Sequence, residues 1–228
     1  MTNALPPPKG KVAIVPSILS ADMAELGKAV KTAERGGADW VQVDVMDGHF
    51  VPNLSFGPGV VASLRKRTKL ALDAHLMITS PENFIAPFAK AGADLVTVHY
   101  EAARNPLAAL KKIRAAGMKA GLALKPDTPV GRARKYLAHI DLLLIMTVYP
   151  GFGGQDFLPQ SPERISQARH MIDASGKKIW LQVDGGIHAK TVAIAAGAGA
   201  DSLVAGSAVY GAENPAGAIT FLRKLSQQ

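Results

Sequence analysis

A chain of 228 residues, 48% hydrophobic and 19% charged, can bury a substantial core and is not the composition of a disordered protein. It has no cysteine, which excludes disulfides and thiolate chemistry, and no apolar run approaches the ~20 residues of a membrane-spanning helix. The net charge of +8 admits nucleic acid, but the basic residues are dispersed and no aromatic-interleaved basic stripe occurs, so we expect an anionic small substrate and neither a nucleic-acid nor a membrane partner.

The first eleven residues carry three prolines and lack the apolar core of a signal peptide. We therefore expect residues 1–11 to form a flexible leader. No later shift in composition marks a linker, so residues 12–228 are expected to be one catalytic domain. A cytoplasmic location is the default for such a chain.

Beyond the leader, β-branched apolar runs alternate with amphipathic segments eight times. Strands are expected from 12 onward into 16–20, and at 40–45, 70–75, 94–99, 119–124, 141–148, 178–183 and 202–205. Helices are expected at about 22–35, 57–66, 80–92, 105–116, 127–138, 161–174, 188–196 and 214–225. Eight strand–helix units predict an α/β fold, a single-domain (β/α)8 TIM barrel. A doubly wound open sheet would not usually need eight units.

The stretch 40–56 places polar side chains on an otherwise apolar strand. Because side chains alternate along a strand, Gln42, Asp44 and Met46 share one face and the valines share the other. Such polar groups are costly in a sealed core but not at a pocket. Asp44 alone could equally cap the strand or accept backbone hydrogen bonds.

Polar residues and glycines fall where the predicted strands end, which is the active-site face of a barrel. The strand ends supply Ser17, Asp44, His75, His99 and Asp184, and glycine-rich loops follow the last three strands at 151–154, 185–186 and 206–207. Glycine lets backbone N–H groups approach a phosphate closely. One glycine pair is usually a plain turn, but three on adjacent loops favour a phosphate cradle.

The two carboxylates stand three strands apart in a ring of eight, so Asp44 and Asp184 are expected to face each other across the mouth. Carboxylates on opposite sides of a substrate carbon can remove a proton from one face and return it to the other, as epimerisation or racemisation requires. A divalent cation between them would keep both ionised and stabilise an enediolate oxygen. His75 is the natural extra ligand.

Seven motifs, in this order, resemble the ribulose-phosphate 3-epimerase family. They are PSILSAD at 16–22, VDVMDGHFVPN at 43–53, HLM at 75–77, MTV at 146–148, PGFGGQ at 150–155, VDGG at 183–186 and GSA at 206–208. The resemblance covers about residues 12–226. It implies interconversion of ribulose 5-phosphate and xylulose 5-phosphate through a metal-stabilised 2,3-enediolate, by a homo-oligomer.

The same resemblance implies roles for individual residues. Asp44 and Asp184 would be the acid–base pair and metal ligands, and His75 a ligand that also contacts substrate. The implied substrate-binding residues, chiefly at the phosphate, are Ser17, Gly151, Phe152, Gly153, Gly154, Gly185, Gly186, Gly206 and Ser207, with Met46, Met77 and Met146 beside the enediolate. The implied cofactor is one divalent cation, whether zinc, iron, manganese, cobalt or magnesium.

Two positions depart from the family pattern. Gln42 stands where the family usually has a histidine ligand, and a carboxamide oxygen binds zinc-like metals more weakly than imidazole does. We therefore expect Gln42 to be a weak ligand that favours harder ions, or to hydrogen-bond the substrate. Tyr149 is a smaller departure, since the family more often has a polar or acidic residue there.

Four competing functions bear on this interpretation. Orotidine-phosphate decarboxylase and hexulose-phosphate synthase carry Asp-x-Lys-x-x-Asp on the third strand, whereas residues 73–78 read DAHLMI without the lysine or the second aspartate. That difference argues against their chemistry. A 3-epimerase for another ketose phosphate, such as allulose 6-phosphate, stays open. So does a catalytically weakened relative that binds sugar phosphate as a sensor, which Gln42 motivates.

Overall fold

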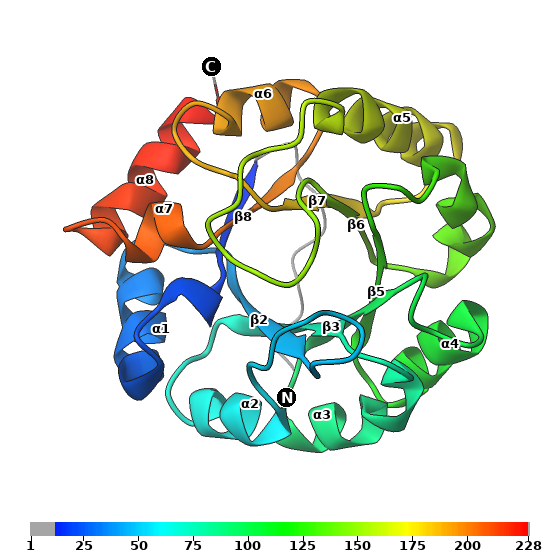
Figure 1. Cartoon of the computed structure of the whole chain (residues 1–228), viewed down its shortest axis with the longest axis horizontal. Helices are drawn as coiled ribbons and strands as arrows, with labels where there is room; N and C mark the ends of the chain where they lie inside the picture. The colour runs from blue at the N-terminus through cyan, green and yellow to red at the C-terminus, as the bar shows by residue number, and fades with distance from the viewer. Residues whose placement is uncertain (1–11, 228) are drawn as a thin grey trace.

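The computed structural model describes residues 12–227, which form a ring of strands inside a ring of helices (Figure 1). The predicted leader, residues 1–11, lies outside the described residues. The strands are β1 (Ala13–Pro16), β2 (Trp40–Met46), β3 (Ala71–Met77), β4 (Leu95–His99), β5 (Lys119–Leu124), β6 (Leu142–Met146), β7 (Trp180–Asp184) and β8 (Ser202–Ala205).

Helices follow the strands along the chain. The α-helices are α1 (Leu26–Arg35), α2 (Pro58–Arg65), α3 (Ile85–Ala91), α4 (Pro106–Ala115), α5 (Ser161–Ala174), α6 (Val192–Gly197), α7 (Ser207–Tyr210) and α8 (Pro215–Leu225). The 3-10 helices are η1 (Ile18–Ser20), η2 (Met23–Glu25), η3 (Pro81–Asn83) and η4 (Val130–His139). Within residues 12–227, no helix is long and apolar enough to cross a membrane.

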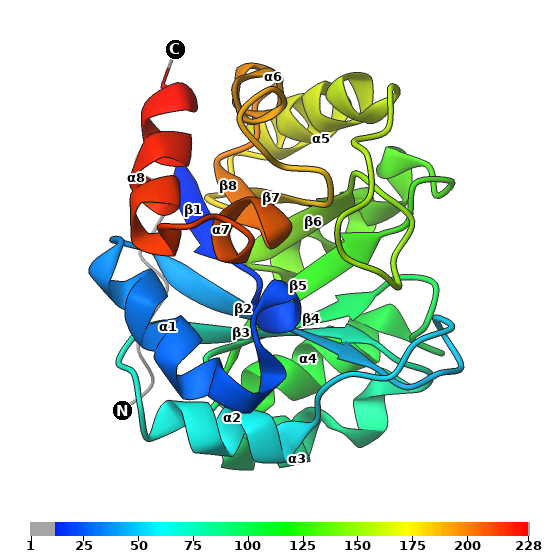
Figure 2. The same ribbon diagram turned by 60° about the vertical axis from the view of Figure 1, so that its left-hand side comes forward.

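The strands pair in parallel in the order β1-β8-β7-β6-β5-β4-β3-β2. A parallel bridge between Ser17, just after β1, and Gln42 on β2 joins the two ends of this sheet. The eight-stranded ring with helices outside confirms the predicted TIM barrel, and its strand order places β2 and β7 across the mouth from each other. The loops that follow β2 and β6 project from the same end of the barrel (Figure 2).

Two apolar clusters cover the two faces of the strands. The outer cluster, between strands and helices, takes the valines of β2 at positions 41, 43 and 45. The inner cluster fills the barrel and includes Trp40 and Trp180, whose rings pack edge to face with their centroids 5.2 Å apart. Since inward residues alternate along β2, Trp40 is followed inside the barrel by Gln42 and then Asp44, so the polar residues sit above an apolar plug.

Three helices differ clearly from the sequence prediction. The predicted helix at 127–138 is the 3-10 helix η4, which begins after Pro129 and buries Val130, Ala133, Tyr136 and Leu137. The helix predicted from residue 188 begins at Val192, because Thr191 closes a hydrogen-bonded turn with His188. The short helix α7 after β8 was not predicted.

Close packing inside the barrel predicts a stability effect at Gly121 on β5. A Cβ there would collide with Oγ1 of Thr97 and lie 2.9 Å from the Thr97 Cβ. We expect Gly121→Ala to lower the free energy of unfolding by about 1–3 kcal/mol in urea denaturation, because an overpacked core must shift. The matched control is Gly59→Ala in α2, where a Cβ meets nothing within 4 Å and the protein should become slightly more stable. Equal effects at both positions would contradict the packing argument.

Candidate active site

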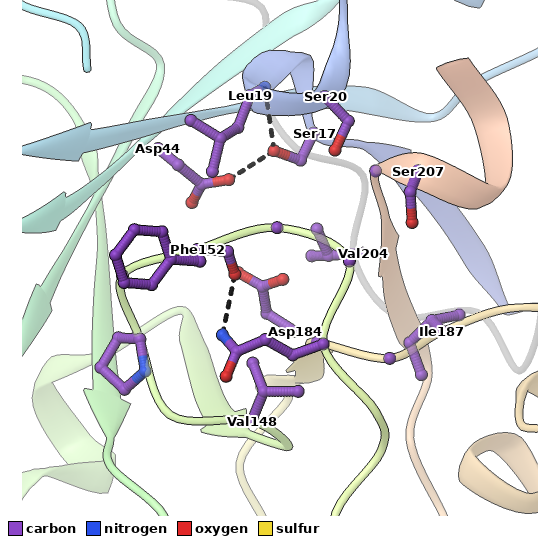
Figure 3. A pocket seen from close by; sticks show the side chains of 18 of the residues that line it. Ser17, Leu19, Ser20, Asp44, Val148, Phe152, Asp184, Ile187, Val204 and Ser207 are labelled. Atoms are coloured by element: carbon purple, nitrogen blue, oxygen red, sulfur yellow. Dashed lines mark hydrogen bonds between the residues drawn. The ribbon is translucent and has the colours of Figure 1, made fainter. Parts of the chain in front are cut away.

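A cavity of about 130 Å³ opens at the C-terminal ends of the strands (Figure 3). The predicted site residues that line it are Ser17, Asp44, Met46, Met77, Met146, Gly151, Phe152, Gly153, Gly154, Asp184, Gly185, Gly186, Gly206 and Ser207. Gln42 and His75 do not line the cavity, because both are fully buried behind the two aspartates. The barrel thus gathers residues from six strands and their loops into one site.

The carboxylates of Asp44 and Asp184 lie on either side of a single amide group. Nε2 of Gln42 donates one hydrogen bond of 2.8 Å to Oδ1 of Asp44 and another of 2.7 Å to Oδ2 of Asp184. The second oxygen of Asp44 accepts a hydrogen bond from the hydroxyl of Ser17. The two carboxylates therefore face each other across the barrel mouth, as the strand order requires.

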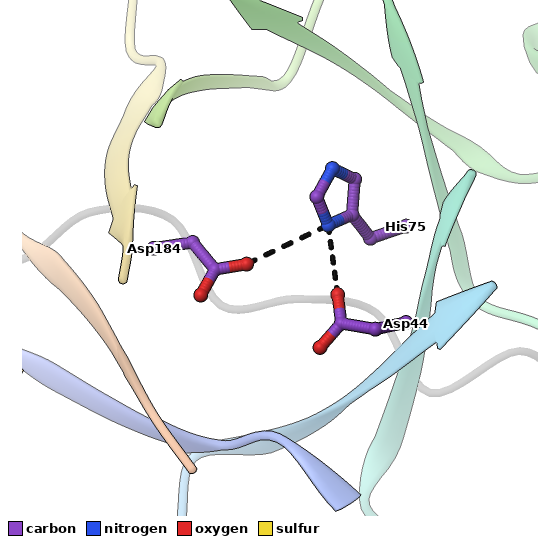
Figure 4. A group of neighbouring side chains, drawn as sticks. All are labelled: Asp44, His75 and Asp184. Atoms are coloured by element: carbon purple, nitrogen blue, oxygen red, sulfur yellow. Dashed lines mark hydrogen bonds and ion pairs between the residues drawn. The ribbon is translucent and has the colours of Figure 1, made fainter. Parts of the chain in front are cut away.

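The imidazole of His75 completes a group of three side chains that point toward one another from β2, β3 and β7 (Figure 4). Its Nδ1 lies 2.8 Å from Oδ1 of Asp44 and 3.6 Å from Oδ2 of Asp184. One ligand atom from each of the three residues lies within 4.8 Å of the others. This spacing lets the group hold one metal ion.

Without a cation, protons balance the charge of this group. Burial of the His75 ring lowers its pKa, but the hydrogen bonds and charges of Asp184 and Asp44 outweigh burial and raise the pKa to about 10. Burial, and next the charge of Asp44, raises the pKa of Asp184. The two carboxylates therefore favour the protonated ring, and a cation bound at Nδ1 would displace the proton there.

The side chain of Gln42 tests whether the site suits a cation. Two carboxylates only accept hydrogen bonds, so in the absence of a cation the amide must present its NH₂ to them. The other end, Oε1, is buried and accepts no hydrogen bond from residues 12–227. Exchanging the two ends would turn this oxygen toward the carboxylates, which is favourable only with a cation between them. Two carboxylates, one imidazole and one carboxamide oxygen fit a divalent cation.

Glycines bring the loops after β6 and β7 into close contact at the cavity wall. Gly185 has φ of +116°, and a Cβ there would lie 2.6 Å from Cγ1 of Val148. At Gly186 a Cβ would lie 2.6 Å from Cα of Phe157. Packing alone thus requires glycine at both positions. The loop backbone they permit forms the wall of the cavity, beside Gly206 and Ser207.

Three methionines give the cavity an apolar, polarisable lining. Met46 and Met77 are neighbours in the register of β2 and β3, and with Val51 they form a small apolar cluster. Met146 ends β6 as the register partner of Asp184. Thioethers carry no transferable proton, so the carboxylates of Asp44 and Asp184 are the ionisable groups beside them.

The profile of the ribulose-phosphate 3 epimerase family matches residues 13–210. The chain belongs to this family. Among its curated relatives, the ribulose-phosphate 3-epimerase of Mycobacterium tuberculosis is 51% identical over 92% of this chain and 91% of that protein. The enzyme of the same name from Bacillus subtilis is 47% identical over 93% of this chain and 98% of that protein.

More distant solved structures share the barrel of this epimerase-family chain. Orotidine 5′-phosphate decarboxylase from Pyrococcus horikoshii superposes with a TM-score of 0.68 at 18% identity, over 94% of this chain and 99% of that one. A 3-hexulose-6-phosphate synthase superposes with a TM-score of 0.66 at 24% identity, over 92% and 98% of the two chains. At these identities the likeness concerns the fold alone.

One departure from the family pattern points away from the site. Tyr149 is half exposed, and its hydroxyl donates a 2.7 Å hydrogen bond to Oδ1 of Asp127 on the loop after β5. That hydrogen bond raises the pKa of the Tyr149 phenol. The side chain does not line the cavity. Tyr149 therefore leaves the carboxylate pair untouched.

Several residues at this epimerase-family site were not predicted from the sequence. The cavity is also lined by residues adjacent to the predicted motifs or within them, namely Leu19, Ser20, Val148, Pro150, Gln155, Asp156, Ile187, His188 and Val204. The sequence feature that could have identified them is their position within or beside the family motifs. His99 was noted only as a strand end, yet its Nε2 lies 2.9 Å from Nε2 of His75. Burial lowers the pKa of His99 to about 4, so this second ring is neutral.

Proposed function

We propose that this chain is a metal-dependent isomerase that interconverts ribulose 5-phosphate and xylulose 5-phosphate by inverting carbon C3. The observation that carries the proposal is the pair Asp44 and Asp184, held on opposite sides of one cavity by the amide of Gln42. A single carboxylate exchanges a proton on one face, whereas inversion needs a second group on the other. Membership of the epimerase family supports the same reaction.

The proposed mechanism divides the work between the two carboxylates. One removes the C3 proton to leave a planar 2,3-enediolate, and the other delivers a proton to the opposite face. Their roles exchange in the reverse direction. The hydrogen bond from the Ser17 hydroxyl orients Asp44 during both steps. Met46, Met77 and Met146 would cover the intermediate without donating a proton to it.

The proposed cation ligands are Asp44, His75, Asp184 and Oε1 of Gln42. When bound, a divalent cation would keep both carboxylates ionised and stabilise negative charge on a substrate oxygen. Three oxygen donors and one nitrogen favour manganese or magnesium over zinc. A site with an imidazole in place of the Gln42 oxygen would favour zinc more. His75 serves in this proposal as a ligand behind the substrate, because its ring is fully buried.

The proposed phosphate site is the set of backbone N–H groups on the glycine loops. Gly185, Gly186 and Gly206 belong to the loops after β7 and β8, where barrels commonly hold phosphate. Ser17, Ser207 and the 151–154 loop border the same cavity. Phe152 is 55% exposed at its edge and would cover a bound sugar.

The further parts of the proposal concern location and assembly. We propose a cytoplasmic homo-oligomer with a small phosphorylated ketose as its other partner. Large apolar side chains that are mostly exposed, such as Met23 at 54% and Leu54 at 74%, are available to an interface between copies.

The experiment that tests the function is exchange in D₂O. The metal-free chain is incubated with ribulose 5-phosphate and one divalent ion at a time, NMR follows deuterium at C3 and formation of xylulose 5-phosphate, and metal content is measured on the same sample. Allulose 6-phosphate and unphosphorylated ribulose are the matched comparisons, and both are expected to react more slowly. If allulose 6-phosphate reacts faster than ribulose 5-phosphate, allulose 6-phosphate is the preferred substrate and the proposed substrate is wrong. If no divalent ion supports deuterium exchange at C3, the enzyme proposal fails. The remaining alternative is then the sugar-phosphate sensor that Gln42 motivates.

A further inference from the structure

The ring nitrogen of His75 that faces away from the carboxylates has a partner of its own. Its Nε2 lies 2.9 Å from Nε2 of His99, and both rings are fully buried. Two nitrogens at this distance form a hydrogen bond only if one carries a proton and the other presents a lone pair. The hydrogen positions on His99 therefore decide which nitrogen of His75 must carry a proton.

The second nitrogen of His99 determines where that ring carries its proton. Nδ1 of His99 lies 3.3 Å from Oε2 of Glu101, and an ionised carboxylate only accepts. His99 must therefore donate from Nδ1 to Glu101, so that its Nε2 can accept a hydrogen bond from Nε2–H of His75. The chain of donors then runs from Nε2–H of His75 to His99, and from Nδ1–H of His99 to Glu101.

Contacts around His99 and Glu101 hold this arrangement in place. Oε1 of Glu101 accepts a 2.8 Å hydrogen bond from the backbone N–H of Lys125 and another from the hydroxyl of Thr128. Phe50 packs against His99 with ring centroids 4.9 Å apart, and the ammonium group of Lys125 lies 3.7 Å from the centroid of Phe50. These contacts restrain both Glu101 and the ring of His99.

We propose that Glu101 and His99 are positioning residues that keep the proton of His75 on Nε2, so that Nδ1 presents its lone pair to a cation between Asp44 and Asp184. The proposal rests on the metal site of the proposed function. Metal-binding histidines generally donate their other N–H to such a partner, and loss of the partner weakens metal binding about 10- to 100-fold. Neither Glu101 nor His99 lines the cavity, so they act through His75.

The variant Glu101→Gln reverses the hydrogen-bond demand on His99. The backbone N–H of Lys125 requires an acceptor, so the amide oxygen should take the Oε1 position and turn NH₂ toward Nδ1 of His99. His99 would then carry its proton on Nε2, facing the Nε2–H of His75. We expect zinc affinity, measured by competition with a chelating dye, to fall about tenfold. We expect ¹⁵N NMR of the imidazoles to show His99 changing from the Nδ1–H to the Nε2–H form.

Matched variants separate positioning from plain stability. Thr128→Val removes a contact to Glu101 but leaves Oε2, so zinc affinity and the His99 signals should stay as in the wild type. His99→Gln can still offer an oxygen to Nε2–H of His75 and should bind zinc more tightly than His99→Leu does. This pair tests the proposal even if Glu101→Gln does not fold.

Two outcomes would overturn the proposal. One is a wild-type chain in which NMR finds the His99 proton on Nε2. The other is a result in which Glu101→Gln or His99→Leu lowers the thermal stability of the protein but changes neither its zinc affinity nor its imidazole signals. A wild-type chain that binds no divalent ion would refute the proposed metal site instead. The proton position on His99 can still be measured in that metal-free protein, so the two failures are distinguishable.

Discussion

Replacing either carboxylate, by Asp44→Asn or Asp184→Asn, is expected to lower kcat/KM for C3 epimerisation by about 10³-fold or more, because an amide cannot act as a general base. The loss should be asymmetric. If each carboxylate serves one face of C3, each variant retains exchange with solvent in one epimer only, and the two variants retain opposite epimers. Deuterium incorporation, started separately from each ketose phosphate and followed by NMR, measures this.

The matched control for these variants is Asp39→Asn. Asp39 directly precedes β2 at the opposite end of the barrel, where it forms an ion pair of 2.8 Å with Arg223 and accepts a hydrogen bond from the N–H of Ile14. This change should cost stability but leave epimerisation within about twofold, since the carboxylate lies outside the site. Retention of exchange in the same epimer by both site variants would contradict the division of roles.

Gln42→His is expected to raise zinc affinity by about a hundredfold, near 2.7 kcal/mol, because imidazole is a better zinc ligand than a carboxamide oxygen. The structure adds a second reason. Nε2 of Gln42 donates to both Asp44 and Asp184, so zinc binding to the wild type must break two hydrogen bonds and turn the amide over. Dye competition on the metal-free protein measures the change, and manganese affinity should rise less than zinc affinity.

The barrel supplies a matched control for Gln42→His at position 182. Gln182 stands two residues before Asp184, as Gln42 stands two before Asp44, but its amide donates to the hydroxyl of Ser202 instead of to the carboxylates. Gln182→His should leave zinc affinity unchanged. A similar gain at both positions, or none at position 42, would show that Gln42 does not face the cation.

Much of the fold could be predicted because strand and helix periods are local properties. The limits of β5, β8 and α5 agree with the sequence prediction to the residue. The helix type of η4 could not be predicted, since the buried spacing of Val130, Ala133, Tyr136 and Leu137 fits an α-helix as well as a 3-10 helix. The later start of α6 comes from a local turn, in which the Thr191 hydroxyl donates to the carbonyl of Gly186 and accepts from the N–H of His188.

The candidate site was predictable to the extent that it follows from strand ends. Asp44, His75 and Asp184 were identified because the carboxyl ends of parallel strands meet at one rim. The role of His99 could not be predicted, because a histidine at a strand end does not reveal which neighbour it contacts. Burial at 0% and a 2.9 Å approach to His75 supplied that information.

The sequence by itself determined the eight strand–helix units, the rim that carries the polar side chains and the family motifs, because these depend on neighbours along the chain. Only the tertiary structure decided which atoms meet. Gln42 reaches Asp184 across 142 positions of sequence, and His75 reaches His99 across 24. Such contacts depend on closure of the barrel and on the direction of each side chain. These contacts show that Gln42 hydrogen-bonds both carboxylates and that His99 lies against His75, the proposed metal ligand.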